Sequence, residues 1–169
     1  MGEILDEIAD CVPALRRYAR ALTHNRDGAD DLVQDCLERA IRKRSLWRPI
    51  GPIRPWLFRI LLNLHRNELR HLRRNPTAAS LDEFTERLAT PGSQFEHAAL
   101  AETARAMERL PDEQREALLL VAVEGLDYRQ AAEVLEIPVG TLMSRLGRAR
   151  TALRQMTSEN GRPVLKAIK

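Results

Sequence analysis

The clearest alternation of apolar and polar positions lies towards the C-terminal end of the chain. Apolar residues recur there at spacings of three and four, as on one buried stripe of a helix, at Val139, Leu142, Leu146, Ala149 and Leu153. Upstream, Asp127 and Gln130 have the spacing of a capping box, which predicts a short helix over 128–135. A turn over 136–138 would set the two helices at a steep angle, so the segment predicts a helix-turn-helix.

The polar face of the second predicted helix carries hydroxyl and guanidinium groups. In a helix-turn-helix this helix reads the major groove of DNA, so we expect DNA contacts from Thr141, Ser144, Arg145 and Arg148. Basic residues opposite an apolar stripe are also common on an ordinary solvated face. The pattern alone leaves that alternative open.

Three further helices are predicted in the first part of the chain. The apolar positions indicate one helix over 5–23, in which Pro13 should cause a kink or a restart. A second helix over 28–43 would be capped by Asp27 and would expose Asp31, Gln34, Asp35 and Glu38. These acids and the amide form a compact polar patch suited to a protein partner.

The third helix should begin near Pro55 and end near Arg74. Beside its apolar stripe it carries a second stripe at the same period, which we call the cationic stripe: Trp56, Arg59, Asn63, Arg66, Asn67, Arg70 and Arg73. Arginine binds phosphate and an aromatic ring stacks on an unpaired base, so the first six residues are predicted to bind a DNA strand. A solvated helix face without acids is the alternative.

The helical pattern weakens between the two regions. Residues 75–97 contain proline, glycine and serine without a sustained period, which predicts a flexible linker. We therefore expect two small helical domains, over 1–74 and 98–157, followed by a tail over 158–169. Their relative position should be set by partners rather than by a shared core. Aromatic residues are only 4% of the chain and no alternating run of strand length occurs, so the fold class is all-α.

Charge is distributed in blocks. Residues 36–74 hold eleven bases and two acids, whereas residues 75–108 hold six acids and two bases. Residues 139–169 again hold seven bases and one acid. Two basic regions separated by an acidic one predict two separate contacts with a polyanion.

Other classes of function find little support in the sequence. Cys11 and Cys36 are too isolated for a disulfide framework or a zinc site, and no His lies at ligand spacing, so we expect no metal and no cofactor. Acids, His and Cys do not converge at catalytic spacing, so we do not expect an enzyme. We expect no membrane insertion and a cytoplasmic location, because no signal peptide and no long apolar run occur.

Several motifs, in this order, resemble the extracytoplasmic-function (ECF) sigma factors of the bacterial sigma-70 group. Asp27-Gly28-Ala29-Asp30-Asp31-Leu32-Val33-Gln34-Asp35 is similar to the region 2 helix that grips core RNA polymerase. Arg54-Pro55-Trp56-Leu57-Phe58-Arg59-Ile60 with Asn63 is similar to the promoter-melting helix. Leu110-Pro111 with Arg115, Gly125-Leu126-Asp127-Tyr128, and the run from Ile137 to Leu146 with Arg148-Ala149-Arg150 resemble region 4.

The resemblance implies a transcription initiation factor that directs core RNA polymerase to specific promoters. Residues 1–74 would bind polymerase and recognise and melt the minus-10 element, and 98–157 would recognise the minus-35 element. The implied polymerase-binding residues are Asp31, Leu32, Gln34, Asp35 and Glu38. Residues 10–40 look most like the general-stress subgroup, whose members are held by an anti-sigma factor and freed by a decoy protein.

Two positions depart from the family pattern. Met143 stands where relatives often carry a lysine that contacts a phosphate or a base, so that contact is not carried over. In the family the loop equivalent to 48–52 captures a flipped promoter base, but here the loop is unusually rich in proline, so its base preference is not carried over. The alternative function is a helix-turn-helix regulator that acts without polymerase. Such a regulator would have a sensor or receiver domain in place of residues 27–74, and the sequence shows none there.

Overall fold

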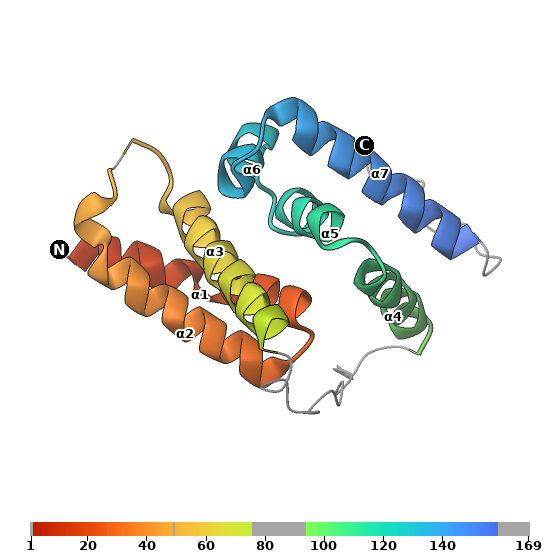
Figure 1. The fold of residues 1–169 in the computed structure, drawn as a ribbon, viewed down its shortest axis with the longest axis horizontal. Helices are drawn as coiled ribbons and strands as arrows, with labels where there is room; N and C mark the ends of the chain where they lie inside the picture. The colour runs from red at the N-terminus through yellow and green to blue at the C-terminus, as the bar shows by residue number, and fades with distance from the viewer. Residues whose placement is uncertain (1, 49, 76–93, 159–169) are drawn as a thin grey trace.

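The computed structural model describes residues 2–48, 50–75 and 94–158, and within these ranges the chain is helical without a strand. The all-α class is therefore confirmed for the described residues. Figure 1 shows the elements in two groups that lie side by side. They are α1 (Gly2–Thr23), α2 (Arg26–Arg42), η1 (Arg44–Leu46), α3 (Ile53–Arg74), α4 (Gln94–Glu108), α5 (Asp112–Leu118), η3 (Leu119–Val123), α6 (Tyr128–Leu135) and α7 (Val139–Ser158).

The N-terminal group packs α1, α2 and α3 against one another. The predicted restart at Pro13 does not occur: α1 runs through it, and buried Ile8 and Leu15 lie on either side of it. The predicted cap of α2 is also wrong. Asn25, not Asp27, is the N-cap, and its side-chain oxygen accepts hydrogen bonds from the backbone N–H groups of Asp27 and Gly28.

The C-terminal group contains the predicted helix-turn-helix. The capping box is confirmed, because the Asp127 carboxylate accepts from the Gln130 N–H and the Gln130 side chain accepts from the Asp127 N–H. α6 covers the predicted residues 128–135, and α7 starts at Val139 after a turn in which Glu136 adopts a left-handed conformation with φ of 55°. Gly125, with φ of 70°, ends the preceding helical segment.

The sequence pattern was less reliable around α4. This helix begins at Gln94, inside the segment predicted as linker, and the remainder of that segment, 76–93, lies outside the described residues together with the tail over 159–169. Leu100 is 67% exposed in this helix, whereas Ala106 and Leu110 are buried.

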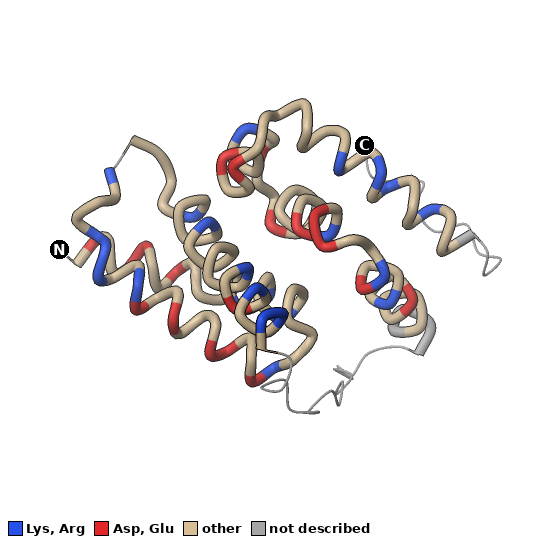
Figure 2. Tube along the Cα trace, viewed as in Figure 1, with Lys and Arg blue, Asp and Glu red and all other residues tan. Residues whose placement is uncertain are grey.

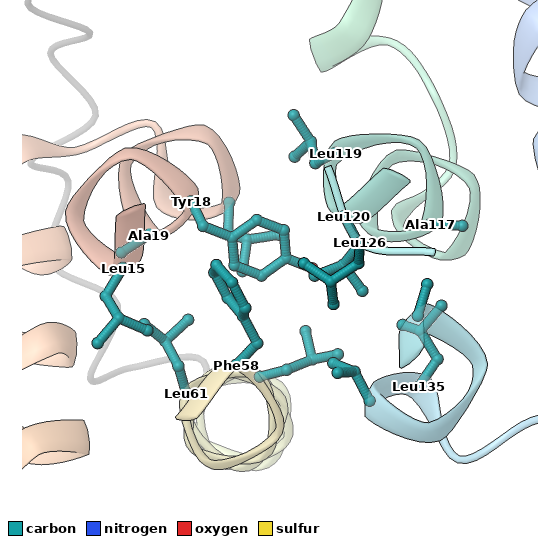
Figure 3. Close-up of a cluster of buried hydrophobic side chains, with 14 of the residues drawn as sticks. Leu15, Tyr18, Ala19, Phe58, Leu61, Ala117, Leu119, Leu120, Leu126 and Leu135 are labelled. Carbon is teal, nitrogen blue, oxygen red and sulfur yellow. The ribbon is translucent and has the colours of Figure 1, made fainter. Parts of the chain in front are cut away.

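The two groups of helices share an apolar contact. Tyr18 of α1 and Phe58 of α3 meet edge to face with ring centroids 5.2 Å apart. Figure 3 shows the Tyr18 ring directed towards Leu120 and Leu126 of the C-terminal group. The expectation that the halves lack a shared core is therefore corrected. Phe58 and Leu62 extend the apolar surface of α3 beyond the stripe seen in the sequence, so α3 is covered on two sides.

Candidate nucleic-acid interface

The cationic stripe of α3 lies beside the C-terminal group. Figure 2 shows the basic residues of α3 next to acidic positions of α5 and α6. Among the residues predicted to bind a strand, Arg59, Asn67 and Arg70 are exposed, and Trp56 and Asn63 are half-buried. The structure thus leaves part of the stripe open and covers the rest.

Two clefts open along the contact between α3 and the C-terminal group. The first, of about 190 Å³, is lined by Trp47, Trp56 and Arg59 together with Gln130 and Glu133 of α6. Its tryptophans and arginine have the chemistry that binds an unpaired base and its phosphate. Arg48, Gly51 and Pro52 of the proline-rich loop line the same cleft.

The second cleft, of about 280 Å³, lies between the C-terminal part of the cationic stripe and α7. Arg66, Arg70 and Arg73 line it from α3, and Glu116 and Arg145 line it from the other side. Arg66 donates to the Glu116 carboxylate at 2.7 Å. Burial alone would lower the pKa of Arg66, but the hydrogen bond and the charge of Glu116 raise it overall.

On α7 the predicted reader residues do not share one environment. Thr141, Ser144 and Arg148 are exposed, whereas the Arg145 side chain is only 18% exposed and lies 3.6 Å from the Glu113 carboxylate. Met143, the departure from the family pattern, is 55% exposed on the same helix. Most of the predicted reader face is therefore exposed to solvent in this structure.

The predicted polymerase-binding patch lies on the face of α2 that is opposite to its buried apolar side chains. Asp31, Gln34 and Asp35 are exposed, and Glu38 pairs with Arg42 at 2.7 Å. Leu32, the fifth residue that the resemblance implies for this patch, is only 4% exposed and belongs to the core. It can support the patch from beneath but does not present its side chain to a partner.

The environment of Glu124 was not predicted from the sequence. The Glu124 carboxylate, with a fully buried side chain, accepts from Arg17 of α1 at 2.9 and 2.7 Å and from Arg54 of α3 at 2.8 Å. The hydrogen bond with Glu124 raises the pKa of Arg17. A single acid after the apolar run 117–123 was the only signal for this site, and nothing local indicated its partners.

Metal-binding and membrane features were also sought. Within the described ranges, no group of three His, Cys, Asp or Glu side chains is placed to hold a metal ion. In those same ranges no helix has the length and apolar character needed to cross a membrane. Burial raises the pKa of the Cys36 thiol to about 12, so this cysteine is unreactive.

Comparison with known proteins matches both groups of helices to sigma domains. Residues 8–62 match the Sigma2 domain of PhyR, and residues 100–153 match Sigma-70, region 4. The chain is 38% identical over 156 residues to the ECF RNA polymerase sigma factor EcfG of Rhodopseudomonas palustris, covering 92% of this chain and 86% of that protein. The chain belongs to the ECF sigma factor family.

Other relatives agree with this assignment. The sigma factor is 32% identical to the ECF RNA polymerase sigma-E factor of Escherichia coli over 73% of this chain and 70% of that one. The solved structure of RpoE from Bartonella quintana, in complex with the anti-sigma factor NepR, superposes with a TM-score of 0.79 at 31% identity, over 94% and 98% of the two chains. The protein is thus a sigma factor, which binds core RNA polymerase and directs it to specific promoters. Sigma factors as a class are not catalytic enzymes.

Proposed function

We propose that this sigma factor divides its task among three surfaces. The exposed face of α2, around Asp31 and Asp35, binds core polymerase. The cationic stripe of α3 binds the melted strand of the minus-10 element. The exposed face of α7 reads the minus-35 duplex. The observation that carries this proposal is that the three surfaces lie on separate elements. The α2 surface is acidic, which suits a protein partner, and the α3 and α7 surfaces are basic, which suits two contacts with DNA.

The division into domains follows the same proposal. Residues 1–74 form the region 2 domain, 75–97 the linker, 98–157 the region 4 domain and 158–169 the tail. The matched segments 8–62 and 100–153 fall within the two domains and support these limits.

An anti-sigma factor is a further proposed partner. RpoE of Bartonella quintana was solved bound to NepR, and CnrH was solved bound to the cytosolic domain of CnrY. We extend this kind of regulation to the present chain and assign it to the general-stress subgroup. We also propose a cytoplasmic location and no catalytic activity, because a promoter-directing subunit acts where polymerase and DNA are and leaves the chemistry to polymerase.

The test is in vitro transcription with core RNA polymerase and a genomic promoter library. Transcripts that start only when this protein is added should share two sequence elements, which the experiment identifies. A protein that binds duplex DNA but yields no new start sites would instead support the polymerase-independent regulator.

A further inference from the structure

Across the contact between the two groups of helices, carboxylates of the C-terminal group pair with guanidinium groups of the N-terminal group. Glu124 has no exposed side-chain surface, and its carboxylate accepts hydrogen bonds from Arg17 and Arg54 of the N-terminal group. It follows directly on the π-helical turn η3, which closes with a hydrogen bond of 2.9 Å from the Glu124 N–H to the Leu119 carbonyl. π-Helical turns are rare and often lie at functional sites.

A second carboxylate acts on the cationic stripe itself. Glu116 is 5% exposed at its side chain and accepts from Arg66 at 2.7 Å, and the Arg73 guanidinium lies 3.8 Å from Asp112. A guanidinium that holds a carboxylate cannot offer the same N–H groups to a phosphate. The C-terminal group therefore occupies, with its acids, positions that a nucleic-acid strand would need.

We propose that Glu116 and Glu124 form a charge latch that closes the cationic stripe of α3 against a nucleic-acid strand. In the closed chain, Glu116 takes the place of a phosphate on Arg66, and Glu124 fixes α1 and α3 to the C-terminal group. A strand and the latch compete for the same face, so strand binding requires the two groups of helices to separate. This inference rests on the proposed role of α3 as the strand-binding helix.

The latch is suited to opening as a unit. A buried carboxylate that loses its partners while still enclosed is costly, so the contacts of Glu124 favour either full closure or full separation. On separation, the carboxylates and the arginines return to water and their charges are hydrated. The apolar part of the contact, around Tyr18 and Phe58, opposes this separation and keeps the free chain closed.

The first experiment measures the affinity of the full chain for a fluorescent single-stranded oligonucleotide by anisotropy. The variant Glu116→Gln/Glu124→Gln removes two charges from the latch, and Glu3→Gln/Glu68→Gln removes two exposed charges for which the structure shows no ion pair. The control measures the general effect of charge. The latch variant should bind at least about fivefold more tightly than the control, the lower end of usual coupling between sites. Its radius of gyration in X-ray scattering should also increase.

A second pair of variants distinguishes the latch from a general effect of charge, because the two predict opposite changes in strand affinity. Arg17→Ala removes one partner of Glu124, and its side chain is 52% exposed and lies outside the cationic stripe. Loss of a positive charge should by itself weaken strand binding. The latch predicts the reverse, tighter binding than in Arg16→Ala, which removes the neighbouring exposed arginine. Arg17→Ala also carries the test if the buried Glu124 variant does not fold, as judged by circular dichroism.

One further variant distinguishes failure of the latch from failure of the proposed function. Arg70 is an exposed member of the cationic stripe, so Arg70→Ala should weaken strand binding in the wild-type and latch-variant backgrounds. If Arg70→Ala has no effect in either background, α3 is not the strand-binding helix. If Arg70→Ala weakens binding but the latch variants behave like their controls, the latch is overturned and the strand-binding role stands.

Discussion

His65 lies on α3 with 7% of its surface exposed, close to charged residues of the C-terminal group. Burial lowers the pKa of His65 below its ordinary value of 6.5, with Asp112 acting in the opposite direction. The pKa of His24 is lowered in the same way, by burial and then by Arg115. The unfolded chain therefore binds these protons more readily than the folded chain does.

We predict that the free energy of unfolding falls as the pH drops through the ordinary histidine pKa of 6.5. Above that pH both histidines are neutral in either state, and the stability is complete. Urea unfolding at two pH values, one on each side of 6.5, measures the loss. His65→Gln should reduce it, whereas His71→Gln, at an exposed position, should leave it unchanged. An equal loss in all three proteins would contradict the prediction.

Individual residues were predictable where one helix face decides their environment. The period identified Leu142, Leu146 and Ala149 as core, and all three are fully buried. The period could not identify Phe58 or Glu124, because their environments depend on segments far away in the chain. Leu32 belongs to the family motif and is buried, because a motif that runs along a whole helix includes residues that face the core.

At the scale of the element, the outer face of α2 gives a test of polymerase binding. Asp31 and Asp35 lie one helical turn apart and are both exposed. Changing both to Arg should weaken binding to core polymerase in a pull-down without unfolding the protein, because neither side chain packs in the core. The matched control changes Asp6 and Asp10 of α1, which have the same spacing and exposure. Unchanged binding in the α2 variant would argue against this surface.

The reader face of α7 gives a second prediction at this scale. Arg145→Ala and Arg148→Ala should each weaken binding of promoter duplex by about 1–3 kcal/mol for a lost base contact, or reduce the salt slope by about one unit for a lost phosphate contact. Anisotropy titrations over a range of salt concentrations measure both quantities. Arg154→Ala, also exposed but near the end of α7, is the control. If neither affinity nor salt slope changes, α7 is not the reader.

Elements with strong local signals were predicted well. The capping box and the turn over 136–138 located α6 and α7 from the sequence. Pro13 was misleading because α1 packs on both sides of it, and this packing outweighs the hydrogen bond that a proline removes. The start of α4 was missed because its apolar face is short and Leu100 points to solvent.

At the scale of the whole molecule, the shared apolar contact predicts cooperative unfolding. Trp47 and Trp56 both belong to the N-terminal group, so tryptophan fluorescence reports on that group and on its contact with α6, whereas circular dichroism reports on all helices. The two unfolding curves of the wild type should coincide. Phe58→Ala should lower the free energy of unfolding by about 3–5 kcal/mol, because it removes a fully buried ring. Ile50→Ala, at a position that is 85% exposed, is the control. Separate curves in the wild type would contradict a common core.

The contact between the two groups of helices could not be predicted from the sequence. Each group has an apolar stripe that its own helices can bury, so nothing in the pattern demands the contact between them. The charge blocks located the basic regions, but they could not show that Glu116 and Glu124 pair with arginines of the N-terminal group.

The pairing of Arg66 with Glu116 also has a consequence for the order in which a ribosome makes the chain. The two residues are 50 positions apart, and Arg17 and Glu124 are 107 apart. At about 5–20 residues per second, the first gap takes about 3–10 s to translate. During that interval the nascent N-terminal group emerges without the carboxylate partners of Arg17, Arg54 and Arg66 and without the apolar cover of Tyr18 and Phe58. Newly made chains are therefore open to RNA and to premature partners in a way that completed chains are not.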